Sequence, residues 1–205
     1  MPSPADLAQH RACLEFADAV ALTTRRQFAP AMQKFAAAHA ALFALYRDPA
    51  HPDLAHVALF RTVALLAAGQ GAGAAGPAEA LAARGMIKAW EGCKISGLGT
   101  EAYHRSGGLT PPALAHYRQA VAAFAEAIDL LEAGLGADDP ELYGPLGDYS
   151  GLLRAVGREA DADLAYDRAI ALPPKALSPT MIGGGYPIIA LDPFGTNPLL
   201  PSQTP

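Results

Sequence analysis

Three aspartates in the stretch GREADADLAYDRAIALPP, residues 157–174, raise the question of whether this chain carries an acidic site. Asp161, Asp163 and Asp167 fall within seven residues of one another. Clustered carboxylates bind divalent cations, and paired carboxylates exchange protons in acid–base catalysis. The alternative is a helix whose charges face water and pair with neighbouring arginines. The element that carries the aspartates decides between these interpretations.

Histidine and cysteine side chains form two further candidate groups. His51, Asp53 and His56, in the sequence HPDLAH, are metal-ligand types, but their spacing is not a recognised zinc pattern. Cys93 is a possible nucleophile, and His104 is its nearest histidine in the sequence. The chain has no GxSxG sequence and no glycine-rich phosphate loop after a strand. We therefore expect no catalytic residue, no metal and no cofactor.

The composition favours a helical globular protein. Of the 205 residues, 51% are hydrophobic and 17% are charged, which suffices for a substantial core. Alanine supplies much of the apolar fraction and aromatic residues make up 7%, a mixture that suits closely packed helices better than sheets. The net charge is −5 and no block of lysine or arginine occurs, so neither nucleic acid nor a membrane surface is the expected partner.

The cysteines, the N-terminal residues and the most apolar segment indicate in which cellular compartment the protein is expected. Cys13 and Cys93 lie far apart without CxxC spacing, which is typical of reduced thiols. The N-terminal MPSPADLAQH lacks the basic start and apolar run of a signal peptide. The apolar segment 54–69 is interrupted by His56 and Arg61 and is too short to span a bilayer. We expect a soluble, cytoplasmic protein.

Hydrophobic spacing predicts helices along most of the chain. Residues 112–132 give the clearest pattern, with large apolar residues at intervals of three and four. Further helices are predicted at about 5–22 and 53–68, the latter apolar nearly all round and therefore central. A second stripe at helical spacing consists of Phe28, Met32, Phe35, His39, Leu42 and Tyr46. His39 is thus expected to be a core or boundary histidine. No stretch alternates with period two, so no sheet is expected.

Two connections and a change of composition divide the chain. Residues 69–77 form a glycine-rich connection, and 96–112 are expected to be a long connection between helices. The last 33 residues contain eight prolines and four glycines, and their only charges are Lys175 and Asp192. We expect a helical domain over 1–172 and an extended Pro/Gly-rich segment over 173–205.

A small–aromatic–small triplet recurs 42 residues apart. The two copies are Ala120, Phe124, Ala127 and Ala162, Tyr166, Ala169. Residues 143–174 resemble one repeat of the tetratricopeptide repeat (TPR) family. Core positions of that motif are matched by Leu146, Tyr149, Ser150, Leu153, Ala162, Tyr166 and Ala169, its turn by Gly157, and its terminating proline by Pro174. The 42-residue spacing is similar to that of kinesin-light-chain repeats.

The resemblance implies an all-α fold: a right-handed TPR-like α-solenoid of about three to four helix-turn-helix repeats. In such repeats Ala162 and Ala169 are small because two helices cross closely, and Tyr166 fills the gap between them. The three aspartates then fall on the other faces of their helix, where they pair with arginines. The acidic cluster is therefore interpreted as part of the scaffold.

Three glycines suggest where such a scaffold binds. Gly144, Gly147 and Gly151 in YGPLGDYSGLLR would lie on one side of a helix, leaving bare backbone that an extended peptide can approach. First helices of TPR repeats line the concave groove, so this is a candidate peptide-binding strip, with Asp148 and Arg154 as its charged residues. Alternatively, the helix begins later and the glycines are loop. The sequence leaves both interpretations open.

The expected function is that of a protein–protein interaction scaffold or adaptor that binds a peptide or partner protein. One alternative is an enzyme or accessory subunit with a site near 90–112, formed around Trp90, Cys93, Tyr103 and His104. Another is a self-assembling repeat protein, so a homo-oligomer is possible. For the C-terminal segment we favour a cap over the last repeat. A linear motif for another protein and a peptide that undergoes modification are the other interpretations.

Overall fold

The computed structural model describes residues 3–71 and 75–173, and within these ranges every regular element is a helix. The predicted all-α class is confirmed for this part of the chain. The described residues divide into two compact units, one ending at Ala83 and one beginning at Arg84. Helix α4, Pro77–Ser106, contributes its first turns to the first unit and the remainder to the second. The expected C-terminal segment lies, from residue 174 onward, outside the described residues.

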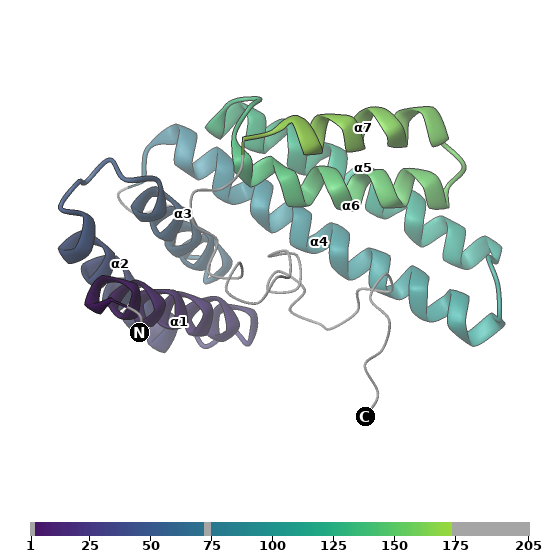
Figure 1. Ribbon diagram of the computed structural model, residues 1–205. Coiled ribbons are helices and arrows are strands. Elements are labelled where there is room, and N and C mark those ends of the chain that lie inside the picture. The colour runs from purple at the N-terminus through teal and green to yellow at the C-terminus, as the bar shows by residue number, and fades with distance from the viewer. Residues whose placement is uncertain (1–2, 72–74, 174–205) are drawn as a thin grey trace. The chain divides into compact units, whose positions relative to one another are not determined.

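The first unit contains α1 (Pro4–Thr24), α2 (Phe28–Tyr46) and α3 (Pro52–Ala67). Helix α1 lies alongside α2, and α2 also packs on α3 (Figure 1). Helix α1 begins with a capping box: Ser3 Oγ accepts from the Asp6 backbone N–H at 3.1 Å, and the Asp6 carboxylate accepts from the Ser3 N–H at 2.8 Å. The turn into α2 passes through Arg26 with a left-handed φ of 59°.

Aromatic rings form the centre of the first unit. The Phe16 ring meets Phe35 edge-on at 5.9 Å and Phe60 at 5.2 Å between centroids. Helix α3 buries residues around most of its circumference, in agreement with its nearly all-round apolar sequence. The prediction for His39 is wrong, because His39 is exposed. Helix α2 turns Phe35, Ala38 and its other buried residues toward the neighbouring helices, and His39 falls just past that seam.

The second unit contains the rest of α4, α5 (Pro111–Leu135), the short 3₁₀ helix η1 (Pro140–Leu142), α6 (Tyr143–Ala155) and α7 (Glu159–Ala171). The expected long connection at 96–112 is wrong, since α4 continues to Ser106 and only residues 107–110 join it to α5. Glycines in α4 lower its intrinsic helix propensity. Contact with α5 compensates, because Gly92 and Gly99 lie directly against side chains of α5.

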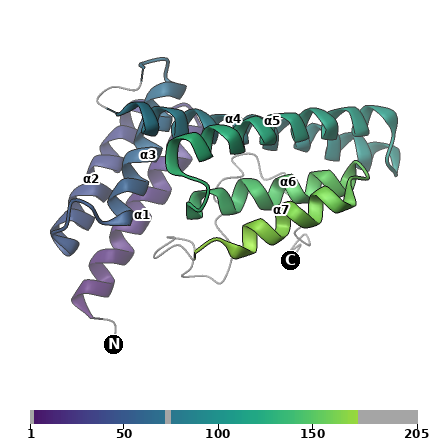
Figure 2. The same cartoon turned by 90° about the horizontal axis from the view of Figure 1, so that it is seen from above.

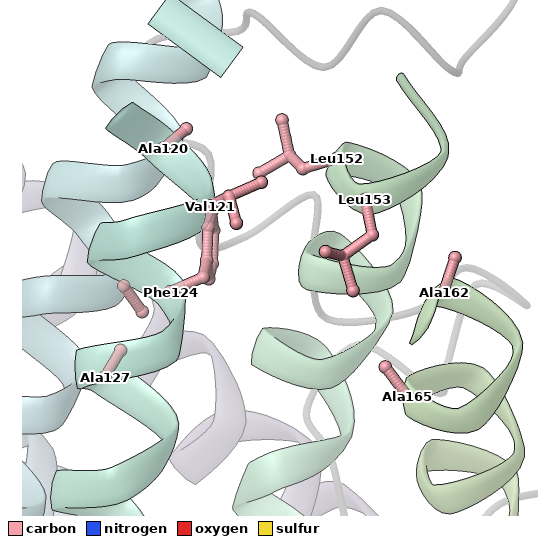
Figure 3. Close-up of a cluster of buried hydrophobic side chains, with 9 residues drawn as sticks. Ala120, Val121, Phe124, Ala127, Leu152, Leu153, Ala162 and Ala165 are labelled. Atoms are coloured by element: carbon pink, nitrogen blue, oxygen red, sulfur yellow. The ribbon is translucent and has the colours of Figure 1, made fainter. Parts of the chain in front are cut away.

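Figure 3 shows the core of the second unit. Ala120, Val121, Phe124 and Ala127 of α5 face Leu152 and Leu153 of α6, and the small side chains of Ala162 and Ala165 on α7 lie behind them. Small residues let the backbones approach, and the hydroxyl of Ser150 on α6 donates a 2.8 Å hydrogen bond to the carbonyl of Ala162. Helices α6 and α7 therefore form one tightly packed hairpin, visible from above in Figure 2.

The α6–α7 hairpin contains several residues whose positions were predicted from the sequence. Gly157 lies in the turn with φ 80°, a left-handed conformation that suits glycine. Ala162 and Ala169 are buried against α6. The expectation that Tyr166 fills the gap between the helices is wrong, because its side chain is 48% exposed. Ala165, the residue immediately before it, is buried instead.

Candidate functional site

The glycines of the candidate strip all belong to helix α6. Asp139 caps η1, its carboxylate accepting from the Glu141 backbone N–H at 2.8 Å, and α6 begins directly after η1 at Tyr143. Pro145 lies in the first turn of α6, where a backbone N–H has no helical partner in any case. The helix therefore starts before Gly144, and the interpretation of these glycines as loop is wrong.

Gly144, Gly147 and Gly151 fall on one side of α6, because residues three and seven apart share a helix face. Each is partly exposed. A Cβ atom added at Gly147 would meet no heavy atom within 4 Å outside its own helix and chain neighbours. Leu152 and Leu153 are buried on other sides of the helix and fix its rotation. The backbone of α6 is therefore accessible at Gly147, and the two other glycines on this side of the helix are partly exposed.

Asp148 borders the strip on the side that faces α4. Its Oδ2 lies 3.9 Å from the Sγ of Cys93, within the range of a weak sulfur hydrogen bond. Both side chains are partly buried. The α6 strip thus has one carboxylate that is held next to a thiol of the neighbouring helix.

Arg154 lies one helical turn beyond Gly151 and is held by α7. Its Nη2 donates to Asp163 Oδ1 at 2.7 Å, and its Nε lies 3.8 Å from Glu159. The guanidinium carbon also lies 5.9 Å from the ring centroid of Tyr166. The hydrogen bond to Asp163 raises the pKa of Arg154 above its ordinary value. Arg154 is therefore held at one end of the strip, with its charge paired to two carboxylates of α7.

The acidic cluster that opened the sequence question is exposed on α7. Asp161 accepts from Arg158 Nε at 2.7 Å, and Asp163 accepts from Arg154. Arg168 turns the other way, toward Glu132 on α5 at 2.5 Å. These contacts agree with the scaffold interpretation of the cluster. In the part of the chain that the structure describes, no group of three or more His, Cys, Asp or Glu side chains is placed to hold a metal ion.

The residues of HPDLAH take up separate positions. His51 caps α3: its Nδ1 accepts from the Asp53 backbone N–H at 3.3 Å. His56 packs its ring against Phe16 at 4.9 Å and against Phe60 at 4.8 Å. Asp53 is buried. The two imidazoles therefore serve a helix cap and the aromatic core.

A partly buried polar network in the first unit was missed by sequence reasoning. Tyr46 at the end of α2 donates to Asp53 Oδ2 at 2.7 Å, and Gln9 Nε2 on α1 donates to Tyr46 Oη at 3.1 Å. The His51 ring stacks on Tyr46 with centroids 3.5 Å apart. Burial, and then the hydrogen bond to Asp53, raises the pKa of Tyr46. Burial, and then the charge of Asp53, also raises the pKa of the Cys13 thiol. The network joins three helices.

The residues proposed for an alternative site near 90–112 are spread along α4. Eleven residues of continuous helix separate Cys93 from His104, a rise of about 16 Å. Tyr103 and His104 are exposed near the end of the helix. The nucleophile and the histidine are therefore not brought together.

Two buried ring nitrogens of this unit, Trp90 Nε1 and His116 Nδ1, have no hydrogen-bond partner among the described residues. Gly92 lies opposite Phe124, and Gly99 lies opposite Tyr117. In this antiparallel register His116 lies opposite residue 100 of α4. Trp90 is ten residues away along the same helix, a rise of about 15 Å. The two nitrogens do not share one site.

Comparison with protein-family models, with curated proteins and with solved structures finds no match to this chain. Among the described helices, none combines the length and apolar character needed to cross a bilayer.

Proposed function

We propose that this chain is a protein–protein interaction scaffold that binds an extended segment of a partner protein along α6. The observation that carries the proposal is the strip formed by Gly144, Gly147 and Gly151 in a helix whose other sides are buried. The open space above Gly147 admits a peptide backbone closer than any side chain would allow. Rigid helices also limit the entropy lost on binding.

Charged residues at the α6 strip orient the bound segment. Arg154 is already positioned by Asp163, so it does not have to be ordered when the partner binds. Asp148 supplies the opposite charge one turn from Gly144. Such charges set the direction and the specificity of a bound peptide more than its affinity. Apolar contacts between the peptide and the surface around Gly147 supply most of the binding free energy.

The proposal includes the arrangement of the chain as a right-handed solenoid of about three to four helix-turn-helix repeats of the TPR type. It is supported by the α6–α7 hairpin, by Gly157 in its turn and by the buried alanines of α7. A cytoplasmic location also belongs to the proposal. It is supported by Cys13 and Cys93, which are not joined by a disulfide.

Peptide display against the full-length chain tests this function. Peptides of about twelve residues, enough to follow a helix of this length in extended form, are selected on the wild-type protein and then measured against Gly147→Gln. We expect at least a tenfold loss of affinity, because the glutamine side chain occupies the space of the peptide backbone. Ala122→Gln, at an exposed position of α5, is the matched control and should leave affinity unchanged. Selection of peptides that bind both variants equally would contradict the proposal.

A further inference from the structure

Helix α1 exposes two leucines on the side opposite to its packed face. The residues that α1 buries against the other helices of the first unit are Ala12, Phe16, Ala19, Val20 and Thr23. With 3.6 residues per turn, Leu7 and Leu14 point about 180° away from this group. Their side chains are 56% and 55% exposed. Two leucines aligned two turns apart are more than the scattered apolar residues of an ordinary surface.

The two leucines belong to a seam that continues along the helix. Ala21 follows Leu14 at the same interval of seven residues, and His10 and Ala17 occupy the positions between them. The spacing is therefore three, four, three and four, which is that of the surface along which one helix packs on another in a coiled coil. All five residues are exposed. We call the surface made by Leu7, His10, Leu14, Ala17 and Ala21 the outer face of α1.

We propose that the outer face of α1 binds the same face of a second copy of this chain, with the two helices antiparallel. The twofold axis passes next to Leu14, so the two Leu14 side chains meet there. In this register Leu7 lies next to Ala21 of the second copy. His10 lies next to Ala17 of the second copy. Away from the axis each large side chain thus faces a small one, an alternation that lets the two surfaces interdigitate.

Charged residues beside the outer face favour this register. Arg11 and Asp18 lie on the same flank of the seam, seven residues apart, and both are exposed. A twofold axis between antiparallel helices brings equal flanks together, so Arg11 lies level with Asp18 of the second copy, and the pair occurs twice. Opposite charges beside a helical seam set the orientation of the helices. Asp18 is available for this contact, because its side chain is 63% exposed although Lys34 Nζ lies 3.4 Å from it.

A parallel pairing of the same faces fits less well. It would place Leu7 on Leu7 at one end and Ala21 on Ala21 at the other, so the separation of the helices would have to change along the seam. Across a parallel seam, Arg11 would face Asp6 of the second copy. The carboxylate of Asp6 already accepts a backbone N–H of the capping box at 2.8 Å. The antiparallel arrangement leaves this cap intact.

The size of the contact predicts a dimer that depends on concentration. Helix α1 has 21 residues and offers a strip about 30 Å long and about 10 Å wide. Such a strip is smaller than the roughly 800 Å² that each partner buries in a standard interface. We therefore expect a dissociation constant in the micromolar range. The pairing concerns α1, so it does not depend on the partner site proposed on α6.

Sedimentation velocity of the full-length protein tests the pairing at concentrations from about 1 to about 500 µM, which bracket a micromolar dissociation constant. We expect the weight-average mass to rise from that of one chain toward that of two. The double variant Leu7→Gln, Leu14→Gln removes the apolar groups without adding charge, and glutamine preserves helix propensity. It should raise the dissociation constant at least tenfold.

The matched control is Leu164→Gln, Ile170→Gln on α7, where the two side chains are 70% and 57% exposed. This variant should dimerise like the wild-type protein. Circular dichroism verifies that both double variants retain their helices. A wild-type protein that remains monomeric over the whole range would overturn the proposal. So would a dimer that persists unchanged in the α1 variant, because it would have to form through another surface.

Charge reversal tests the antiparallel register. Arg11→Glu and Asp18→Arg should each raise the dissociation constant at least tenfold, because each brings like charges together at both flanks. Lys34 keeps Glu15 as its partner at 2.8 Å in the second variant. An equimolar mixture of the two variants should form a heterodimer nearly as stable as the wild-type dimer, since both flanks again join opposite charges. Unimpaired dimerisation of Asp18→Arg, or a mixture no more associated than its components, would show that the register is wrong.

Discussion

Gly92 of α4 lies so close to the ring of Phe124 on α5 that a Cβ atom at Gly92 would come within 2.7 Å of the ring carbon Cδ2. The same relationship recurs at intervals of seven residues on both helices. The three pairs are Gly85 with Leu131, Gly92 with Phe124, and Gly99 with Tyr117. A seven-residue interval on both helices is the spacing of a coiled-coil seam. Large side chains of α5 therefore insert where α4 has none, which fixes the register of the α4–α5 hairpin.

The variant Gly92→Ala should lower the free energy of unfolding. Phe124 is almost fully buried and cannot move aside, so the added methyl group overpacks the core. Overpacking typically costs about 1–3 kcal/mol, whereas replacing a helical glycine by alanine gains up to about 1 kcal/mol. We expect a net loss of about 1–2 kcal/mol, measured by urea denaturation of the full-length protein.

Gly147→Ala is the control for this substitution. It makes the same chemical change in a helix, but the added Cβ meets open space. Only the gain in helix propensity remains, so stability should rise by up to about 1 kcal/mol. Equal effects of the two substitutions would contradict the packing argument.

The same glycines explain why the sequence misplaced a connection. Gly97 and Gly99 lie in a stretch of low helix propensity, which predicts a loop when read locally. In the fold, α5 packs along this stretch and stabilises it as helix by tertiary contact. The interval of seven from Gly85 to Gly99 was visible in the sequence. The structural role of this interval could not be predicted, because the large residues of α5 face these glycines only once the α4–α5 hairpin has formed.

Patterns that depend on one helix at a time were predicted well. The spacing of Phe124 with its neighbours gave the buried face of α5, and Ala162 and Ala169 gave the close crossing of α6 and α7. The prediction for Tyr166 failed because Ala165, the residue before it, is the one turned into the core, and the Tyr166 ring lies near Arg154 at the surface. For the glycines of the α6 strip, local helix propensity could not decide between a helix and a loop. Packing of Leu152 and Leu153 decided it.

Replacing Tyr46 by phenylalanine should destabilise the first unit. The hydroxyl of Tyr46 donates to the buried carboxylate of Asp53 and accepts from Gln9. Its removal leaves a buried acceptor without this donor, which costs about 1–2 kcal/mol of unfolding free energy. Urea denaturation measures the loss. Tyr103→Phe, at an exposed position of α4, is the control and should change stability little. A Tyr46→Phe protein as stable as wild type would show that the network contributes nothing net.

Alkaline pH should weaken the fold through Tyr46. Burial and the hydrogen bond to Asp53 raise the pKa of Tyr46, so the folded protein favours its neutral form. The stability contributed by this group is fully present below the pKa of an unfolded tyrosine, about 10, and is lost as the pH rises above it. The free energy of unfolding should therefore fall more steeply between pH 10 and about 12 in wild type than in Tyr46→Phe. Parallel curves for the two proteins would contradict the assignment.

The thiol of Cys13 should react with iodoacetamide at a higher pH than an unperturbed cysteine. Burial, and secondarily the negative charge of Asp53, raises the pKa of Cys13 and so lowers its thiolate fraction at a given pH. The measurement uses a Cys93→Ser background, follows alkylation by mass spectrometry across pH, and compares the folded protein with the same chain in urea. We expect the midpoint of the folded protein to lie above that of the unfolded chain. Steric shielding alone would lower the limiting rate and leave the midpoint in place, so an unshifted midpoint would show that Asp53 and burial do not act on the thiol as argued.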